Sequence, residues 1–299
     1  MSEYHVPVML RESVEGLNIK PGGVYVDVTF GGGGHSRYIL EQLTDGKLIA
    51  FDQDLEAQNN IPASEKLIFV HGNFRFLRNF LRHVGYDEVD GILADLGVSS
   101  HHFDAEERGF SFRFEGPLDM RMNTLAKHDA AYVVNTYDPV RLMEILRIYG
   151  EVDNPKVLVR AITKKRDEKP IETVQELVEA LRPHMPANAQ HKFLAKVFQA
   201  LRIEVNREME ALKQMLEQSL KVLKPGGRLS VITYHSLEDR LVKNFMKTGN
   251  FEGKVEKDFY GNANAPFKVI TRKAVSPTAQ ELEENNRSRS AKLRIAEKL

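Results

Sequence analysis

The chain has 299 residues, in which 42 lysines and arginines balance 42 aspartates and glutamates, and it contains no cysteine. This length allows two domains, and a hydrophobic content of 42% is typical of a folded globular protein rather than a disordered one. The missing cysteine excludes disulfides, iron–sulfur clusters, thiolate zinc sites and cysteine nucleophiles, and a reducing cytosol fits this composition. The net charge of zero argues against a uniformly basic surface for nucleic acid, although it permits local basic patches.

The chain shows no feature of secretion or membrane insertion. Residues 1–10 lack the basic segment and apolar stretch of a secretory signal. No apolar run approaches the roughly 20 residues that span a bilayer. We therefore expect no membrane partner. The ten histidines show no spacing typical of metal ligands, so we expect no metal site either.

Five apolar segments have the composition of buried strands, because they are rich in β-branched and aromatic residues. They cover residues 24–30, 47–52, 67–70, 89–95 and 228–234. Helical segments separate the first four. This alternation predicts an α/β fold, in which helices cover both faces of a parallel sheet.

A long helical segment interrupts the alternation. From Asp95 to Arg228 there are 133 positions, whereas a crossover between parallel strands needs about 30 residues. Asn154-Pro155 is typical of a helix start, and residues 173–181 and 191–205 carry apolar residues at helical spacing. The surplus residues are therefore expected to form helices of their own.

These patterns divide the chain into two domains. We expect residues 105–205 to form an inserted helical domain for substrate recognition, and residues 1–104 and 206–299 to form the sheet domain. A helix over 206–223 returns the chain to the sheet. The remaining C-terminal elements are expected as a helix, a hairpin of two strands, and a last strand or docked tail, over residues 237–246, 251–259 with 267–272, and 291–296.

Four glycines, Gly31 to Gly34, follow the first predicted strand, and they allow a tight turn and the close approach of a ligand. A dinucleotide site has the pattern G-x-G-x-x-G, but Ser36 occupies its third glycine position. The alternative is an S-adenosylmethionine loop, in which an acid precedes spaced glycines. Asp27, Gly31 and Gly33 fit that pattern, with Thr29 in place of its first glycine. A plain tight turn is the third interpretation.

Two acids end the second and the fourth predicted strands. Asp52 lies 19 residues after Gly33, where an acid can accept hydrogen bonds from both ribose hydroxyls of either cofactor. Asp95 ends the fourth strand, and the carboxyl ends of parallel strands line the ligand crevice of such sheets. Asp95 is therefore a candidate contact for substrate or cofactor, with a helix cap or turn as the alternative.

Seven short motifs, in order along nearly the whole chain, resemble those of the MraW-type methyltransferases, the H-type methyltransferases of small-subunit ribosomal RNA. They are residues 5–10 (HVPVML), 29–36 (TFGGGGHS), 95–100 (DLGVSS), 108–112 (RGFSF), 116–122 (GPLDMRM), 234–240 (YHSLEDR) and 287–294 (RSRSAKLR). The resemblance implies a class I, Rossmann-like methyltransferase sheet with a helical insertion. It also implies methyl transfer from S-adenosylmethionine to the exocyclic N4 of one cytidine in the decoding region of 16S rRNA.

The resemblance places the cofactor contacts at seven residues. These are Gly33, Gly34, His35, Asp52, Phe74, Asp95 and His102. His102 departs from the glutamine expected in its motif, and Asn286 departs from an expected proline. On the residues alone, His35 can instead cap the first helix, and a lone phenylalanine such as Phe74 is more often a core residue.

The chemistry of the residues favours an amine as the methyl acceptor. Methylation at cytosine C5 commonly uses a cysteine, which this chain lacks. An exocyclic amine must be aligned with the methyl group, and a carboxylate that accepts an N4 proton helps it react. Asp95 is our candidate for this catalytic role. Past the fifth strand, Ser236 with Asp239 suggests a capping box, and His235 is a candidate substrate contact.

Two stretches carry a local charge of +4. Lys156, Arg160 and Lys164 recur every four residues within the first, and Arg287 and Arg289 belong to the second, residues 285–299. Both can contact RNA phosphates, although a solvated helix face is the commoner explanation.

Phenylalanines at positions 103, 110, 112 and 114 can stack on an unpaired base or fill the seam between the domains. The target base is expected to leave its stack to reach a deep pocket. The expected partner is 16S rRNA within the small ribosomal subunit, and the chain can be a monomer or a homodimer. The alternatives are a class I methyltransferase with another substrate, a nicotinamide dehydrogenase, and a non-catalytic rRNA-binding assembly factor.

Overall fold

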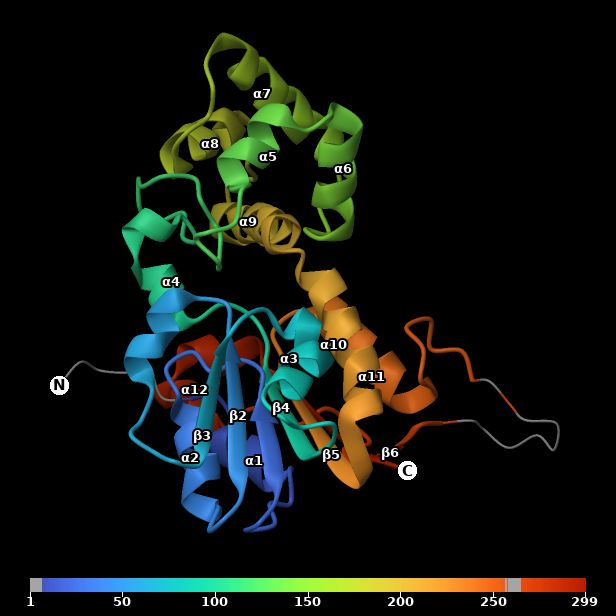
Figure 1. Cartoon of the computed structure of the whole chain (residues 1–299). Helices are drawn as coiled ribbons and strands as arrows, with labels where there is room; N and C mark the ends of the chain where they lie inside the picture. The colour runs from blue at the N-terminus through green and yellow to red at the C-terminus, as the bar shows by residue number, and fades with distance from the viewer. Residues whose placement is uncertain (1–6, 256, 258–264) are drawn as a thin grey trace. The chain divides into compact units, whose positions relative to one another are not determined.

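The computed structural model describes residues 7–255, 257 and 265–299. The chain divides into two compact units (Figure 1). The sheet unit comprises Met1–Gly97 and Met209–Leu299, and the helical unit comprises Val98–Glu208. The sequence placed the insertion at 105–205, a few residues inside the bounds of the helical unit. The two units are described separately below.

The sheet unit is built on seven strands in the order β3-β2-β1-β4-β5-β7-β6. Their bounds are β1 Val24–Asp27, β2 Lys47–Asp52, β3 Leu67–His71, β4 Val89–Asp95, β5 Leu223–Thr233, β6 Phe267–Val269 and β7 Lys292–Lys298. Strands β1 to β5 pair in parallel, and β7 is antiparallel to both β5 and β6. The chain order reverses between β1 and β4, where parallel sheets form their ligand crevice.

Both faces of this sheet are covered, which explains why its strands are apolar at almost every position. On one face, Val26 and Ile92 pack with α3 (Leu77–His83), α10 (Glu208–Val222) and α11 (Ser236–Thr248). On the other, Tyr25 and Leu93 pack with α1 (Leu10–Glu15) and α2 (Gly34–Gln42). Neighbouring residues of one strand thus serve opposite cores.

The shorter elements complete the sheet unit. They are η1 Leu55–Asn60, η2 Phe74–Phe76, α12 Ala279–Glu284 and η5 Asn286–Ser290. None of the helices in the described residues is long and apolar enough to cross a membrane.

The predicted hairpin of residues 251–259 and 267–272 is wrong in its pairing. Strand β6 pairs with β7, and residues 251–255 form no strand. Residues 256, 258 and 259 lie outside the described part of the chain. Phe251, which suggested a strand, instead packs on a helix: its ring stacks on Phe245 of α11 with ring centroids 5.2 Å apart. The strand expected at 291–296 is β7.

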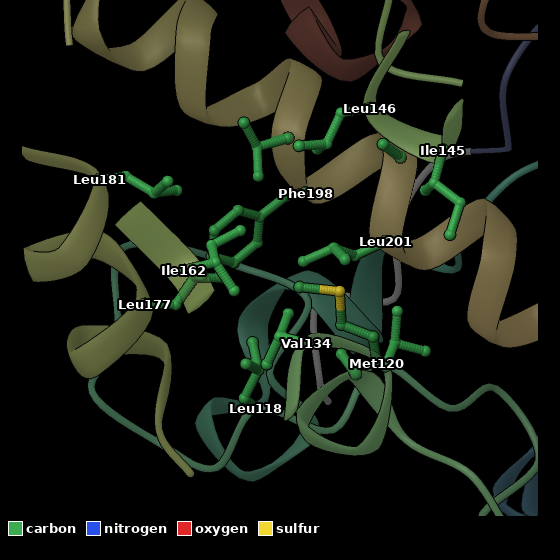
Figure 2. Close-up of a cluster of buried hydrophobic side chains, with 14 of the residues drawn as sticks. Leu118, Met120, Val134, Ile145, Leu146, Ile162, Leu177, Leu181, Phe198 and Leu201 are labelled. Carbon is green, nitrogen blue, oxygen red and sulfur yellow. The ribbon is translucent and has the colours of Figure 1, made fainter. Parts of the chain in front are cut away.

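In the helical unit, the helices surround one hydrophobic core (Figure 2). Its elements are α4 Ser100–Asp104, η3 Glu106–Arg108, α5 Ala130–Thr136, α6 Pro139–Ile148, α7 Pro155–Glu168, α8 Val174–Leu181, η4 Arg182–His184 and α9 Gln190–Asn206. Phe198 and Leu201 of α9 meet Ile162 of α7 and Leu177 of α8 at its centre. Helix α8 begins with a capping box between Thr173 and Glu176.

Two of the phenylalanines proposed for base stacking belong to this core. Phe110 is buried, and Phe112 packs edge-to-face on Phe198 with ring centroids 5.4 Å apart. Both side chains therefore stabilise the helical unit from within. Neither the base-stacking hypothesis nor the seam hypothesis is needed to explain them.

Candidate active site

The glycine run forms a tight connection between β1 and the start of α2. Gly31 and Gly33 adopt positive φ angles of 50° and 75°, which glycine tolerates without strain. A Cβ at Gly31 would meet no atom closer than 4.0 Å, so this backbone faces open space. A Cβ at Gly34 would overlap the ring of Pro7. The loop therefore needs glycine for backbone shape at one end and for close packing at the other.

Asp52, at the end of β2, holds the glycine loop directly. Its Oδ2 accepts a hydrogen bond from the backbone N–H of Gly31 at 2.7 Å, and its Oδ1 accepts one from Asp54 N at 2.9 Å. The Nδ2 of Asn60 donates to the Gly31 carbonyl oxygen at 3.0 Å. The predicted ribose acid and the glycine loop therefore lie together at the carboxyl ends of β1 and β2.

Asp27 is buried beneath the loop and organises it. Its carboxylate accepts a hydrogen bond from the Ser36 hydroxyl at 2.7 Å and one from Thr29 N at 3.1 Å. Burial raises the pKa of Asp27, although His35 and these donors oppose the rise. The departure of Ser36 from the dinucleotide pattern thus has a structural reason, since its hydroxyl satisfies a buried acid.

Asp95 lies at the centre of the site, at the carboxyl end of β4. Its Oδ1 accepts a hydrogen bond from the Tyr234 hydroxyl at 2.7 Å, and its backbone N–H donates to Thr29 Oγ1 at 2.7 Å. Its Oδ2 lies 3.9 Å from Nδ1 of His35. With 22% of its side chain exposed, Asp95 is held from three sides and still open to a ligand.

Burial raises the pKa of Asp95 to about 6. His35 and the hydrogen bond from Tyr234 lower it, while the charges of Asp27 and Glu238 raise it further. Burial also raises the pKa of Tyr234 well above its ordinary value, and the adjacent Asp95 carboxylate adds to the effect. Tyr234 therefore remains a hydrogen-bond donor, and Asp95 is a carboxylate that takes up a proton at about pH 6.

His35 is fixed by the segment that precedes α1. Its Nε2 lies 3.1 Å from the carbonyl oxygen of Val8, and a carbonyl can only accept. Nε2 therefore carries a proton, and Nδ1 faces Asp95. The expected helix cap is not made by His35, because it is the second residue of α2 and Gly33 is the N-cap.

Two predicted cofactor contacts pack against the cores of their units. Phe74 begins η2 in the sheet unit and lies partly buried against its core. His102 belongs to the helical unit, where its 5% exposed ring stacks on Phe110 with centroids 4.9 Å apart. Packing is thus part of the role of both residues, and their contact with a cofactor stays a prediction.

The start of α11 corrects the expected capping box. The N-cap is His235 rather than Ser236, because the His235 Nδ1 accepts a hydrogen bond from Glu238 N at 3.5 Å. Glu238 completes the arrangement by accepting from Tyr234 N at 2.9 Å. The side chain of His235 is only 8% exposed. Its primary role is to begin the helix, and its contact with substrate remains a prediction.

The lysine and arginine candidates for RNA contact are exposed. Lys156, Arg160 and Lys164 form one stripe along α7, while Leu158, Val159 and Ile162 of the same helix face the core of the helical unit.

Two other basic residues between positions 156 and 169 have partners within the helical unit. Arg166 donates to the carbonyl oxygens of Val134 and Tyr137, and Lys169 pairs with Glu176. Arg287 and Arg289 are exposed on η5 of the sheet unit.

Tyr234 is the site residue whose role the sequence did not predict. It directly follows β5, and β5 pairs with β4 so that Ile232 of β5 lies opposite Asp95 of β4. Since the carboxyl ends of neighbouring parallel strands lie at one edge, a polar residue just past β5 can reach the end of β4. The position of Tyr234 just after a predicted strand could have indicated a site residue. The sequence did not show that this strand lies beside β4, so the contact with Asp95 could not be predicted.

Comparison with known proteins agrees with this geometry. The profile of the MraW methylase family matches residues 2–299. The chain belongs to the MraW methylase family. As a MraW methylase it is an enzyme that uses S-adenosylmethionine, and its sheet is the expected class I methyltransferase sheet. The dehydrogenase alternative is thereby excluded.

The curated relatives of this MraW methylase align along nearly the whole chain. A protein of Parabacteroides distasonis is 60% identical over 298 residues, which are 99% of this chain and 98% of the relative. A protein of Cytophaga hutchinsonii is 57% identical, covering 99% of both chains, and one of Flavobacterium johnsoniae is 56% identical, covering 99% and 98%. Each is named ribosomal RNA small subunit methyltransferase H.

Proposed function

We propose that this protein transfers a methyl group from S-adenosylmethionine to the exocyclic N4 of a cytidine in the decoding region of 16S rRNA. The names of its relatives support small-subunit rRNA as the substrate. The observation that carries the choice of an amine is Asp95, a half-buried carboxylate with a raised pKa beside the glycine loop, in a chain without cysteine.

The residues present fit the cofactor. The open backbone at Gly31 admits the methionine end, and Asp52 offers carboxylate oxygens to the ribose hydroxyls. Gly34 and His35 begin α2 beside them, and Phe74 is our candidate for the adenine. When bound, S-adenosylmethionine supplies an electrophilic methyl group on a positively charged sulfur.

Asp95 is the group that receives the proton. Bound S-adenosylmethionine would supply the methyl group to the N4 lone pair, and the electron pair of the broken C–S bond would stay on sulfur. The methylated nitrogen would carry a positive charge, and Asp95 would neutralise it by accepting one N4 proton. A carboxylate whose pKa lies near 6 is suited to this transfer, because it is ionised at neutral pH and still basic enough to accept.

RNA recognition is assigned to the helical unit and to the C-terminal arginines. Lys156, Arg160 and Lys164 present a row of positive charge to solvent, and Arg287 and Arg289 present a second basic segment. Such rows bind phosphates without reading sequence. We place the substrate within the small ribosomal subunit, and the enzyme in the cytoplasm.

The deciding experiment is the transfer of tritiated methyl groups to 30S subunits and to naked 16S rRNA, followed by nucleoside analysis. We expect label in N4-methylcytidine, and greater incorporation into the subunit. Label in C5-methylcytidine or in protein would overturn the proposal. Binding of rRNA without transfer would indicate an assembly factor.

The Asp95→Asn variant tests the mechanism in the same assay. It keeps an oxygen for the Tyr234 hydroxyl but cannot take a proton, so kcat should fall by about 10²- to 10⁴-fold, the usual contribution of a general base. Far-ultraviolet circular dichroism of the variant serves as the control for folding. Wild-type turnover by this variant would exclude Asp95 as the proton acceptor.

A further inference from the structure

We propose that Tyr234 is a positioning residue for methyl transfer, which holds Oδ1 of Asp95 so that Oδ2 receives the proton. The inference rests on the proposed role of Asp95. It adds a residue outside the predicted set of contacts, with a function that acts through Asp95 rather than on the substrate.

The contacts of Asp95 distinguish its two oxygens. Oδ1 accepts the hydrogen bond from the Tyr234 hydroxyl at 2.7 Å. Oδ2 lies 3.9 Å from Nδ1 of His35, which is too long for a hydrogen bond. Because a hydrogen bond already occupies Oδ1, Oδ2 is the more available oxygen for a substrate amine. The tyrosine thus decides which oxygen is the base.

Tyr234 is itself held firmly enough to do this. Its backbone N–H donates to Glu238 Oε2 at 2.9 Å, as part of the cap of α11. Its ring lies over Gly97, where a Cβ would come within 3.1 Å of Cδ2. Gly97 has a φ of 107°, a conformation that glycine adopts readily. The turn after β4 and the residue after β5 therefore pack together, and the hydroxyl points at the carboxylate.

Four groups bear on the ionisation of Asp95. They are His35 from α2, Asp27 from β1, Glu238 from α11, and Tyr234 itself. Only the tyrosine acts through a direct neutral hydrogen bond to an oxygen, which favours the ionised carboxylate. Removing the hydroxyl therefore leaves the charges in place and makes Asp95 easier to protonate.

The test is the pH profile of kcat for Tyr234→Phe, measured with saturating S-adenosylmethionine and 30S subunits. The phenylalanine keeps the ring over Gly97 and removes only the hydroxyl. We expect the acidic limb of the profile to move up by about one pH unit, the usual scale for one hydrogen bond to a charged group. The kcat should fall several-fold at pH 6.5 and approach the wild-type value at pH 9. The KM for S-adenosylmethionine should stay unchanged.

Tyr25→Phe is the matched control. Tyr25 is buried in the same unit, and its hydroxyl accepts a hydrogen bond from Lys20 N at 2.7 Å. It pairs with Gly91, four residues before Asp95 on β4. This variant loses a hydroxyl too, so it should lower stability without moving the pH profile. A wild-type profile for Tyr234→Phe, or an equal shift in both variants, would overturn the inference.

The Asp95→Asn variant separates the two proposals. If it loses turnover while Tyr234→Phe keeps the wild-type profile, the proton acceptor stands and the positioning role fails. If Asp95→Asn turns over normally, the proposed mechanism fails whatever Tyr234→Phe does.

Discussion

The raised pKa of Asp95 predicts that Asp95→Asn makes the folded protein more stable while it removes activity. The folded pKa of about 6 lies roughly two units above the ordinary value of 3.8. A pKa difference of one corresponds to about 1.4 kcal/mol, so ionisation of this carboxylate lowers the free energy of unfolding by about 3 kcal/mol at pH 8. Asparagine carries no charge and keeps an oxygen for Tyr234. The variant should therefore gain stability of this order.

The sign follows from proton binding. The folded state binds the Asp95 proton more tightly than the unfolded state, so the wild type loses stability as pH rises from 3.8 to about 6. Below pH 3.8 both states are protonated and the pH-dependent gain from the substitution vanishes. Urea unfolding followed by far-ultraviolet circular dichroism, at several values between pH 4 and pH 8, measures this difference.

Asp90→Asn is the matched control, because Asp90 lies on the same strand and shifts in the opposite direction. Burial alone would raise the pKa of Asp90, but bonds from Lys224 Nζ at 2.8 Å and Val24 N at 2.9 Å outweigh it and lower the pKa. This variant should lose stability at pH 8, and the loss should shrink as pH falls below 3.8. A loss of stability for Asp95→Asn at pH 8, or a gain that does not vary with pH, would refute the reasoning.

Two further predictions concern the glycine loop and the basic stripe. Gly34→Ala should lower the free energy of unfolding by about 1–3 kcal/mol, because the new Cβ overlaps the Pro7 ring, and it should weaken S-adenosylmethionine binding in calorimetry. A second substitution, Pro7→Ala, should restore part of the stability, and its failure to do so would contradict this cause. Replacing Lys156, Arg160 and Lys164 by glutamine should weaken rRNA binding and reduce its salt slope by about 2, with cofactor binding unchanged; an unchanged slope would mean that the stripe is only a solvated face.

Local sequence patterns determined much of the sheet. The bounds of β2 and β4 agree with the predicted strands, because strands buried on both faces must be apolar at nearly every position. The acids Asp52 and Asp95 were predicted as site residues for a related reason, since polar residues end these apolar runs and the carboxyl ends of the strands line one edge.

Local patterns were weaker where one segment has several possible partners. The apolar residues of 251–255 and 267–269 suggested a hairpin, but Phe251 packs on α11 and β6 pairs with β7. The cap of α11 likewise lies one residue before the predicted one, at His235. In each case the composition was correct, and the choice of partner depended on elements distant in the chain.

The sequence by itself determined the sheet class, the position of the glycine loop and the two acids at the strand ends, because these depend on the order of residues along single segments. Only the tertiary structure decided how Asp95 is held. Its partners Thr29 and Tyr234 lie 66 and 139 positions away, and they meet it only because β1, β4 and β5 are neighbours in the sheet. The raised pKa of Asp95 has the same origin, since burial and the surrounding charges come from several elements at once.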